Sequence, residues 1–277
     1  MFYLLLSIIG GALISVFLRL SQGKVKCSSA MLLANYICCV ALSAAFIGSG
    51  DIFPAGGGLG YAVGTGAING ALYLISFVLM EYTIRKDGIV LPAIFSKLGL
   101  LVPIAVAFIF FSEMPTVFQL VGSALSVFAI LLINYKKGEK LSINMWLILL
   151  LLSDGGGAAM LKVFGETGNV ALSDHFILFT FFFAGLFCLA LVLLKKERMG
   201  LSEFLFGVII GVPNFMGSRF LMSALESMPA VIAYPTRSVA VILVVALAGV
   251  LFFREKLSRS QWIAVATIMA ALILLNI

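Results

Sequence analysis

Four ionisable side chains lie deep inside long apolar stretches of the sequence: Lys97, Asp154, Arg219 and Arg237. A charge is costly in hydrocarbon, so such residues are candidates for function when their stretch spans a membrane. Lysine and arginine bind carboxylate and phosphate groups, and guanidinium does so in a bidentate manner. A buried carboxylate can be tuned to exchange protons near neutral pH. These residue types therefore predict an anion-binding site beside a proton-coupling group.

Polar residues accompany these charges and complete the predicted substrate site. Ser96 precedes Lys97, and Tyr234 and Ser238 flank Arg237. The two stretches also contain four of the seven prolines, which free backbone groups to bind ligand or solvent. Three asparagines within apolar stretches join the set: Asn35, Asn69 and Asn214. We predict that these side chains bind substrate together with Arg219, and that Asp154 couples substrate movement to protons.

Each assignment has a structural alternative. Lys97 or Arg237 can pair with Asp154 in an ion pair that only stabilises the fold. Arg219 can extend its head group toward the membrane surface. Each asparagine can line a cavity or simply join two helices through its amide. Asp154 can be a counter-ion to Arg219 or Arg237 instead of a proton carrier.

The stretches that hold these residues are predicted to be transmembrane helices. The chain has 277 residues, of which 62% are hydrophobic and 11% charged, whereas soluble domains are about 45–50% apolar and about 25% charged. Continuous apolar runs favour helices over barrel strands, and about 20 residues cross a bilayer. The predicted spans are 2–20, 30–48, 58–80, 88–112, 116–134, 143–163, 172–194, 201–225, 229–253 and 259–276. We therefore expect an all-α polytopic membrane protein with ten transmembrane helices.

Basic residues are strongly segregated among the connections between these spans. Odd-numbered connections hold fourteen of the eighteen lysines and arginines, whereas even-numbered connections hold Lys162 alone. Because basic connections tend to stay in the cytoplasm, both termini are predicted to lie outside, in a multi-pass protein of the cell (plasma or inner) membrane. The formal charge of +6 is explained by this orientation and does not indicate nucleic-acid binding.

The two halves of the sequence resemble each other. At an offset of 142 residues, the Phe-Phe-x-Glu of Phe110–Glu113 matches that of Phe252–Glu255. At an offset of 141 residues, the G-x-x-x-G at 66–70 matches the one at 207–211. Small residues in this spacing let helix backbones approach closely in lipid. The repeated motifs indicate an internal duplication.

Each copy contains five spans, an odd number, so the second copy must enter the membrane in the opposite direction. We predict two inverted five-helix repeats, residues 1–138 and 139–277, with a substrate site at the midplane between them. Lys97 and Arg237 lie in equivalent spans. At the offset of 142 residues, Lys97 corresponds to a position two residues after Arg237. The inverted arrangement is expected to place them on opposite walls of one cavity. A duplication in a protein without transport activity is the alternative.

Three features together point to a known family: the five-plus-five spans, an F-x-E at 111–113 and 253–255, and a glutamine six residues after each. They resemble the EamA-type branch of the drug/metabolite transporter superfamily over essentially the whole chain. Residues 96–103 are also similar to a stretch of unassigned bacterial members. The resemblance implies a central cavity lined largely by the third, fourth, eighth and ninth spans, and export or exchange of small metabolites. Many relatives are drawn with cytoplasmic termini, whereas the charges of this chain favour external termini.

The preferred function is a secondary active transporter that moves a small anionic or zwitterionic metabolite by alternating access. A multidrug exporter of the same superfamily is the alternative, but such proteins usually place a carboxylate where Lys97 and Arg237 lie. A membrane-embedded enzyme needs clustered acid–base or nucleophilic groups, and the single histidine, His175, starts a span. A scaffold without flux predicts that removing Lys97 and Arg237 leaves function intact.

The remaining expectations concern ligands and helix ends. We expect no catalytic residue, no cofactor and no metal. The expected partners are a small-molecule substrate and the lipid bilayer, with the oligomeric state left unassigned. Glu113 and Glu255 lie at helix ends and are expected to serve the structure rather than to contact substrate.

Overall fold

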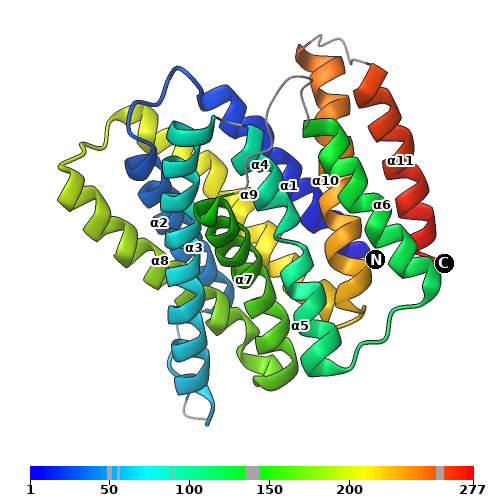
Figure 1. Ribbon diagram of the computed structural model, residues 1–277. Helices are drawn as coiled ribbons and strands as arrows, with labels where there is room; N and C mark the ends of the chain where they lie inside the picture. Colours follow the sequence, from blue (N-terminus) through cyan, green and yellow to red (C-terminus); the bar gives the residue numbers. More distant parts are fainter. Residues whose placement is uncertain (49–51, 55–56, 89, 135–143, 254–258) are drawn as a thin grey trace. The chain divides into compact units, whose positions relative to one another are not determined.

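The protein is built from α-helices. The computed structural model describes residues 1–48, 52–54, 57–88, 90–134, 144–253 and 259–277, and no strand occurs among them. In chain order the helices are α1 (Phe2–Ser21), α2 (Ser28–Ile47), α3 (Leu59–Asp87), α4 (Val90–Leu98), α5 (Leu101–Phe111), α6 (Val117–Asn134), α7 (Met145–Thr167), the short 3₁₀-helix η1 (Val170–Leu172), α8 (Ser173–Lys195), α9 (Leu201–Leu225), α10 (Ala230–Phe253) and α11 (Arg259–Leu275) (Figure 1).

The helices correspond to the predicted spans within about four residues, except that α3 continues to Asp87, seven residues past the predicted end at 80. In the described part of the chain, eight segments are long and apolar enough to cross a membrane, with α4 and α5 counted together as Leu91–Phe111. Two shorter apolar helices, Val117–Leu132 and Gln261–Leu275, supply the other two predicted spans. The prediction of an all-α polytopic membrane protein is confirmed.

The fourth predicted span is two helices rather than one. Gly99 and Leu100 separate α4 from α5. Pro103 has no N–H to donate, and its ring would clash with the carbonyl four residues earlier, which is that of Gly99. This carbonyl instead accepts from the N–H of Val102 at 3.0 Å, in a tighter turn. The matching position of the second copy is Val245, and α10 runs through it without a break.

The helices form two compact units. The first comprises Met1–Leu74 and Val163–Glu226, and the second comprises Ile75–Lys162 and Ser227–Ile277. Each unit therefore contains helices from both halves of the sequence. The repeats predicted at 1–138 and 139–277 describe an internal symmetry, which remains a prediction.

In the first unit, the two G-x-x-x-G motifs let helix backbones meet. A Cβ atom on Gly207 of α9 would lie 2.6 Å from the carbonyl oxygen of Met31 in α2. A Cβ atom on Gly70 of α3 would lie 2.7 Å from the carbonyl oxygen of Thr180 in α8. The helices that receive the two motifs, α2 and α8, are the second spans of the two predicted copies and also pack on each other. An internal two-fold axis would produce this pairing.

In the second unit, α6 and α11 pack along each other, and α10 covers both. Ala129, Val239 and Ile268 form a fully buried cluster where these three helices meet. A separate buried cluster joins α4 to the start of α7: Leu91, Ile94, Phe95 and Leu147. This cluster holds α4 against α7 and so positions the residues at the end of α4.

Candidate functional site

The ten predicted site residues divide between the two units. Asn35, Asn69, Asn214 and Arg219 belong to the first unit, and Ser96, Lys97, Asp154, Tyr234, Arg237 and Ser238 belong to the second. Within the second unit the structure brings the charged residues of α4, α7 and α10 into one electrostatic group. Within the first unit it gives each of the four residues a specific protein partner.

Asp154 of α7 is the centre of the polar group in the second unit. Its Oδ2 accepts a 2.7 Å hydrogen bond from the hydroxyl of Ser96 in α4. Its Oδ1 accepts a 3.1 Å bond from the hydroxyl of Ser76 in the second half of α3. Both oxygens of this carboxylate therefore have a hydroxyl donor from another helix. Ser76 was absent from the predicted site, because a serine in an apolar helix is usually satisfied by its own backbone.

Two cations belong to the same electrostatic group as this carboxylate. Lys97 interacts electrostatically with Asp154 and with Arg237. It occupies the last turn of α4, where the helix carbonyls add partial negative charge. The Lys97 side chain is exposed and that of Arg237 is half-buried, although both are well inside predicted spans. Lys97, Asp154 and Arg237 therefore form a mixed-charge group, as the sequence predicted for a site or for a structural pair.

Close backbone packing sets the distance between α7 and the end of α4. A Cβ atom on Gly99 would lie 3.0 Å from the backbone nitrogen of Gly155, the residue next to Asp154. A Cβ atom on Gly155 would lie 2.7 Å from the Cβ atom of Val102. The glycine run after Asp154 thus serves helix packing at Gly155, which agrees with the expectation that it is not a phosphate-binding loop.

Tyr234 and Ser238 occupy α10 on either side of Arg237. Tyr234 is buried, and its hydroxyl donates a 2.7 Å hydrogen bond to the carbonyl oxygen of Ala158 in α7. This bond ties α10 to the helix that carries Asp154. Ser238 is half-buried. Tyr234 therefore positions the helix, and its role in substrate contact stays a prediction.

The three asparagines join helices of the first unit. The side-chain amide of Asn214 in α9 donates a 3.0 Å hydrogen bond to Oδ1 of Asn35 in α2. Asn69 of α3 donates to the hydroxyl of Thr180 in α8 at 3.3 Å. Of the two alternatives for these residues, the bonds correspond to helix joining. They lie beside the glycine contacts described above, where backbones are close enough for short amides to reach.

Arg219 of α9 has its own carboxylate partner. Its Nε donates to Oδ1 of Asp174 at 2.8 Å, and Nη2 donates to Oδ2 at 3.0 Å. The guanidinium also lies over the ring of Phe46, 4.9 Å from the ring centroid. Neither of the alternatives weighed from the sequence included this partner, because Asp174 lies 45 positions away in another helix. The pair joins α9 to the start of α8.

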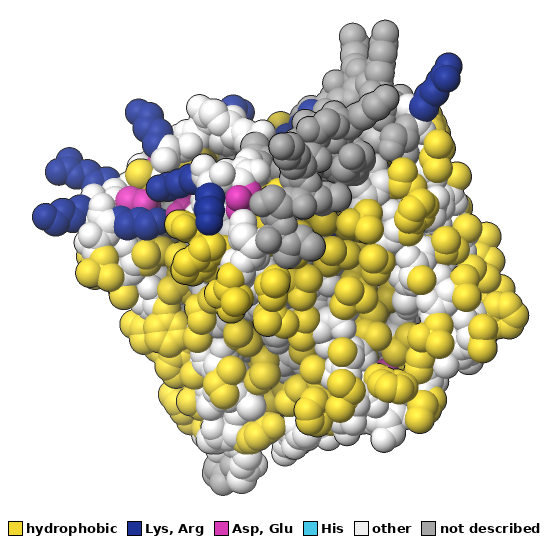
Figure 2. Space-filling model, in the orientation of Figure 1, with side chains coloured by type: hydrophobic (Ala, Val, Ile, Leu, Met, Phe, Trp, Pro, Cys, Tyr) yellow, Lys and Arg dark blue, Asp and Glu magenta, His cyan; other side chains and the backbone are white. Residues whose placement is uncertain are grey.

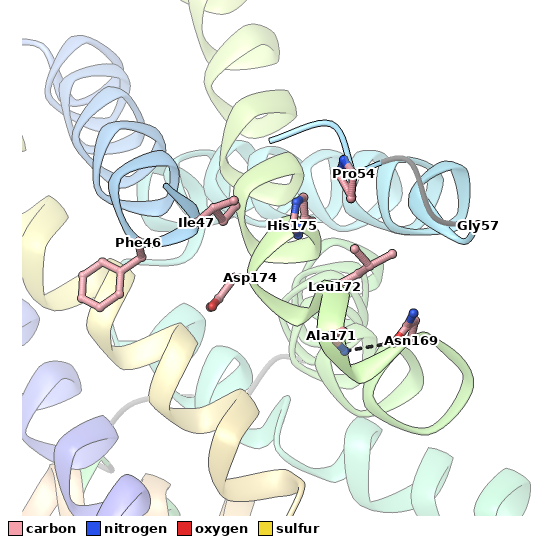
Figure 3. A pocket seen from close by; sticks show the side chains of 9 residues that line it. All are labelled: Phe46, Ile47, Pro54, Gly57, Asn169, Ala171, Leu172, Asp174 and His175. Carbon is pink, nitrogen blue, oxygen red and sulfur yellow. Dashed lines mark hydrogen bonds between the residues drawn. The ribbon is translucent and has the colours of Figure 1, made fainter. Parts of the chain in front are cut away.

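A pocket of about 390 Å³ adjoins this ion pair in the first unit. Figure 3 shows its lining, which comes from the end of α2, the connection after it, η1 with its N-cap residue, and the start of α8: Phe46, Ile47, Pro54, Gly57, Asn169, Ala171, Leu172, Asp174 and His175. Glu226, just after α9, belongs to the same charge cluster. Burial and the negative charge of Asp174 raise the pKa of Glu226, and the cation of Arg219 opposes this shift.

Glu113, expected to serve the structure, links three helices of the second unit. Its carboxylate pairs with the ammonium group of Lys162 in α7, whose side chain is 4% exposed. Its Oε2 also accepts a 2.8 Å hydrogen bond from the N–H of Ala230, the first residue of α10. In the sequence, Lys162 is the one basic residue assigned to an even-numbered connection, against the general segregation of basic residues. Its burial in an ion pair explains why it departs from that segregation. Glu255, the matching acid, lies outside the described residues.

Comparison with known proteins gives a family match for the second half of the chain. Residues 141–277 match the model of the EamA-like transporter family. An uncharacterized protein of Haemophilus influenzae is 23% identical over 204 residues, which cover 71% of this chain and 69% of that protein. A protein of known crystal structure shares the fold with a TM-score of 0.75 and 13% identity, over 99% of this chain and 98% of its own. The second half of this multi-pass membrane protein is therefore a domain of the EamA-like transporter family, which fits the drug/metabolite transporter superfamily.

Proposed function

We propose that the protein is a secondary active transporter that moves a small anionic or zwitterionic metabolite across the cell membrane by alternating access. The observation that carries this proposal is the electrostatic group of Lys97, Arg237 and Asp154 in helices of membrane-spanning length. Lys97 keeps accessible surface although it lies deep among the atoms of the second unit, as is expected of a side chain that meets a substrate.

The two cations supply the binding chemistry. A substrate carboxylate or phosphate accepts hydrogen bonds from the ammonium group of Lys97 and from the guanidinium of Arg237, which offers two parallel donors. The break between α4 and α5 begins two residues after Lys97 and replaces regular helical bonds by tighter turns, and interrupted helices are common at transporter sites. Ser96 and Ser238, which adjoin the cations in sequence, offer neutral hydrogen-bonding groups.

Asp154 supplies the coupling. In the structure its carboxylate is a counter-charge to Lys97. A substrate anion that binds Lys97 replaces Asp154 in this role, and a proton then neutralises the released carboxylate. Ser76 and Ser96 hold the carboxyl group in place in both states, because a protonated carboxyl still accepts hydrogen bonds. Substrate binding and protonation are thereby linked.

The orientation belongs to the same proposal. The segregation of basic residues favours cytoplasmic odd-numbered connections and external termini. A reporter fused to the C-terminus that is active only outside the cytoplasm is expected to be active in whole cells, and a reporter that is active only inside the cytoplasm is expected to be silent. The reverse pattern would overturn the orientation and leave the site proposal unaffected.

Transport itself is tested in proteoliposomes that contain the purified chain. Counterflow is measured for labelled metabolites grouped as anions, zwitterions and lipophilic cations, and we expect exchange of members of the first two groups. Lys97→Ala and Arg237→Ala are each expected to lower exchange by about tenfold or more, since a hydrogen bond to a charged group contributes about 1.5–3 kcal/mol. Matched controls, Lys26→Ala and Arg85→Ala, remove cations of the connections and are expected to keep native exchange.

Two outcomes would overturn the proposal. Exchange of lipophilic cations alone would favour the multidrug exporter, because those substrates carry no group for Lys97 and Arg237. Native exchange in both site variants, with native melting temperatures, would remove the two cations from the substrate site.

A further inference from the structure

Two basic connections of the first unit lie side by side at one end of α2, α8 and α9. The backbone N–H of Lys26, in the connection before α2, donates to Oε1 of Glu203 in the first turn of α9 at 2.8 Å. The ammonium group of Lys195, at the end of α8, donates to the hydroxyl of Ser29 in α2 at 3.2 Å. These contacts gather residues that are about 170 positions apart in sequence into one surface.

The acids and the cations of this surface are arranged differently. Glu203 is 6% exposed, and its carboxylate is occupied by the backbone N–H groups of Lys26 and Cys27. Glu197 is partly buried, accepts from the hydroxyl of Ser29 and lies 4.0 Å from the ammonium group of Lys195. Five cations are instead exposed, and we call them the basic rim: Lys24, Lys26, Lys195, Lys196 and Arg198. Figure 2 shows dark-blue side chains gathered over the connection between α8 and α9.

Exposed leucines lie next to the basic rim in sequence. Leu194, directly before Lys195, is 81% exposed, and Leu201, three residues after Arg198, is 74% exposed. The chain turns sharply between them, because Lys196 ends α8 in the left-handed conformation with φ of 54°. The surface thus presents cations beside apolar side chains at the end of membrane-spanning helices. An anionic lipid is complementary to this surface, because its charged headgroup lies next to apolar acyl chains.

We propose that the basic rim binds the headgroups of anionic phospholipids in the membrane leaflet that it meets. Phosphate oxygens accept charge-assisted hydrogen bonds from ammonium and guanidinium groups, and basic residues beside a transmembrane helix attract anionic lipid. The exposed leucines favour a lipid over a free phosphate, because a free phosphate has no apolar part to cover them. Binding of lipid to the basic rim does not depend on transport activity.

The test uses the full chain, purified in neutral detergent, and native mass spectrometry to count bound lipids. Phosphatidylglycerol and phosphatidylcholine with the same acyl chains are added in turn, and glycerol phosphate serves as the soluble anion. Phosphatidylglycerol is expected to bind at concentrations about tenfold lower than phosphatidylcholine, and glycerol phosphate is expected to show no binding. The variant K196Q/R198Q is expected to lose most of this preference.

A matched control is available at the end of α3, where Arg85 and Lys86 are also exposed. R85Q/K86Q removes the same residue types and the same charge, and it is expected to keep the preference for phosphatidylglycerol. Equal binding of the two lipids to the native protein, or equal losses in the two variants, would overturn the proposal. Competition by glycerol phosphate would assign the rim to soluble phosphates instead.

A second measurement on the native protein does not depend on the folding of any variant. Raising the salt concentration screens exposed charges. Binding of phosphatidylglycerol is therefore expected to weaken with salt, and binding of phosphatidylcholine is expected to stay constant. A preference for phosphatidylglycerol that is independent of salt would contradict an electrostatic rim.

Discussion

The hydroxyl of Ser96 donates a 2.7 Å hydrogen bond to the carboxylate of Asp154, so the residue beside Lys97 holds the acid that interacts electrostatically with this cation. Ser76 holds the second oxygen of the same carboxylate. The geometry is compatible with a permanent counter-ion and with a proton carrier. The two roles predict different transport activity and stability once the charge of Asp154 is removed.

Asp154→Asn keeps the size of the side chain and removes its charge. If Asp154 couples transport to protons, the variant is expected to retain substrate counterflow and to lose accumulation driven by a pH gradient. Both assays use the same proteoliposomes. Loss of counterflow together with a lower melting temperature would instead assign Asp154 to the structure.

The contact between Gly155 and the α4–α5 break predicts a strict size limit. Gly155→Ala places a Cβ atom 2.7 Å from the Cβ atom of Val102, so the helices must separate, and we expect a destabilisation of about 1–3 kcal/mol. Thermal unfolding in detergent measures this change. Gly165→Ala in the same helix is the control, because its Cβ atom would lie 4.0 Å from the nearest atom, Cε of Met222. Equal stability of the two variants would contradict close packing at Gly155.

The ion pair of Lys162 and Glu113 predicts unequal effects of single and double changes. Lys162→Met leaves a partly buried carboxylate without its cation and is expected to destabilise the protein by about 3–5 kcal/mol. The double variant Lys162→Met with Glu113→Gln is expected to be more stable than Lys162→Met alone, because the amide that replaces the carboxylate is neutral and its oxygen still accepts from the N–H of Ala230. A denaturant titration of the three proteins checks the order. Additive losses would show that the two charges do not interact.

The raised pKa of Glu226, which follows α9 and interacts with Asp174 at the start of α8, predicts that the stability of the protein depends on pH. The pKa of Glu226 is raised in the folded protein, by burial and then by Asp174, so the folded state holds this proton more tightly than the unfolded state does. The resulting stabilisation is present at low pH and is lost as the pH rises through the raised pKa. Glu226→Gln is therefore expected to raise the melting temperature by a small amount at pH 7 and to change it little at pH 4.

Melting curves of the native protein and of Glu226→Gln between pH 4 and pH 8 provide the measurement. The difference between the two proteins must grow as the pH rises. A variant that melts below the native protein at pH 7 would show that the attraction of Arg219 for Glu226 outweighs burial.

The division of the fourth span was only partly accessible from the sequence. Pro103 marks where helical bonding fails, because proline acts on the carbonyl four residues earlier. Pro235 inside α10 has the same local chemistry, yet that helix is continuous. The difference therefore depends on packing around each proline, such as the close approach of Gly155 to Gly99.

The sequence alone determined the ten spans, because the hydropathy of about 20 consecutive residues is a local property that lipid selects directly. It also identified the charged residues of the candidate site, because a charge is conspicuous in an apolar run. Only the tertiary structure decided their partners: Asp174 for Arg219, Glu113 for Lys162, and Ser76 with Ser96 for Asp154. These pairs join helices whose sequences carry little more than apolar residues, and which helices touch depends on backbone contacts that no local pattern encodes.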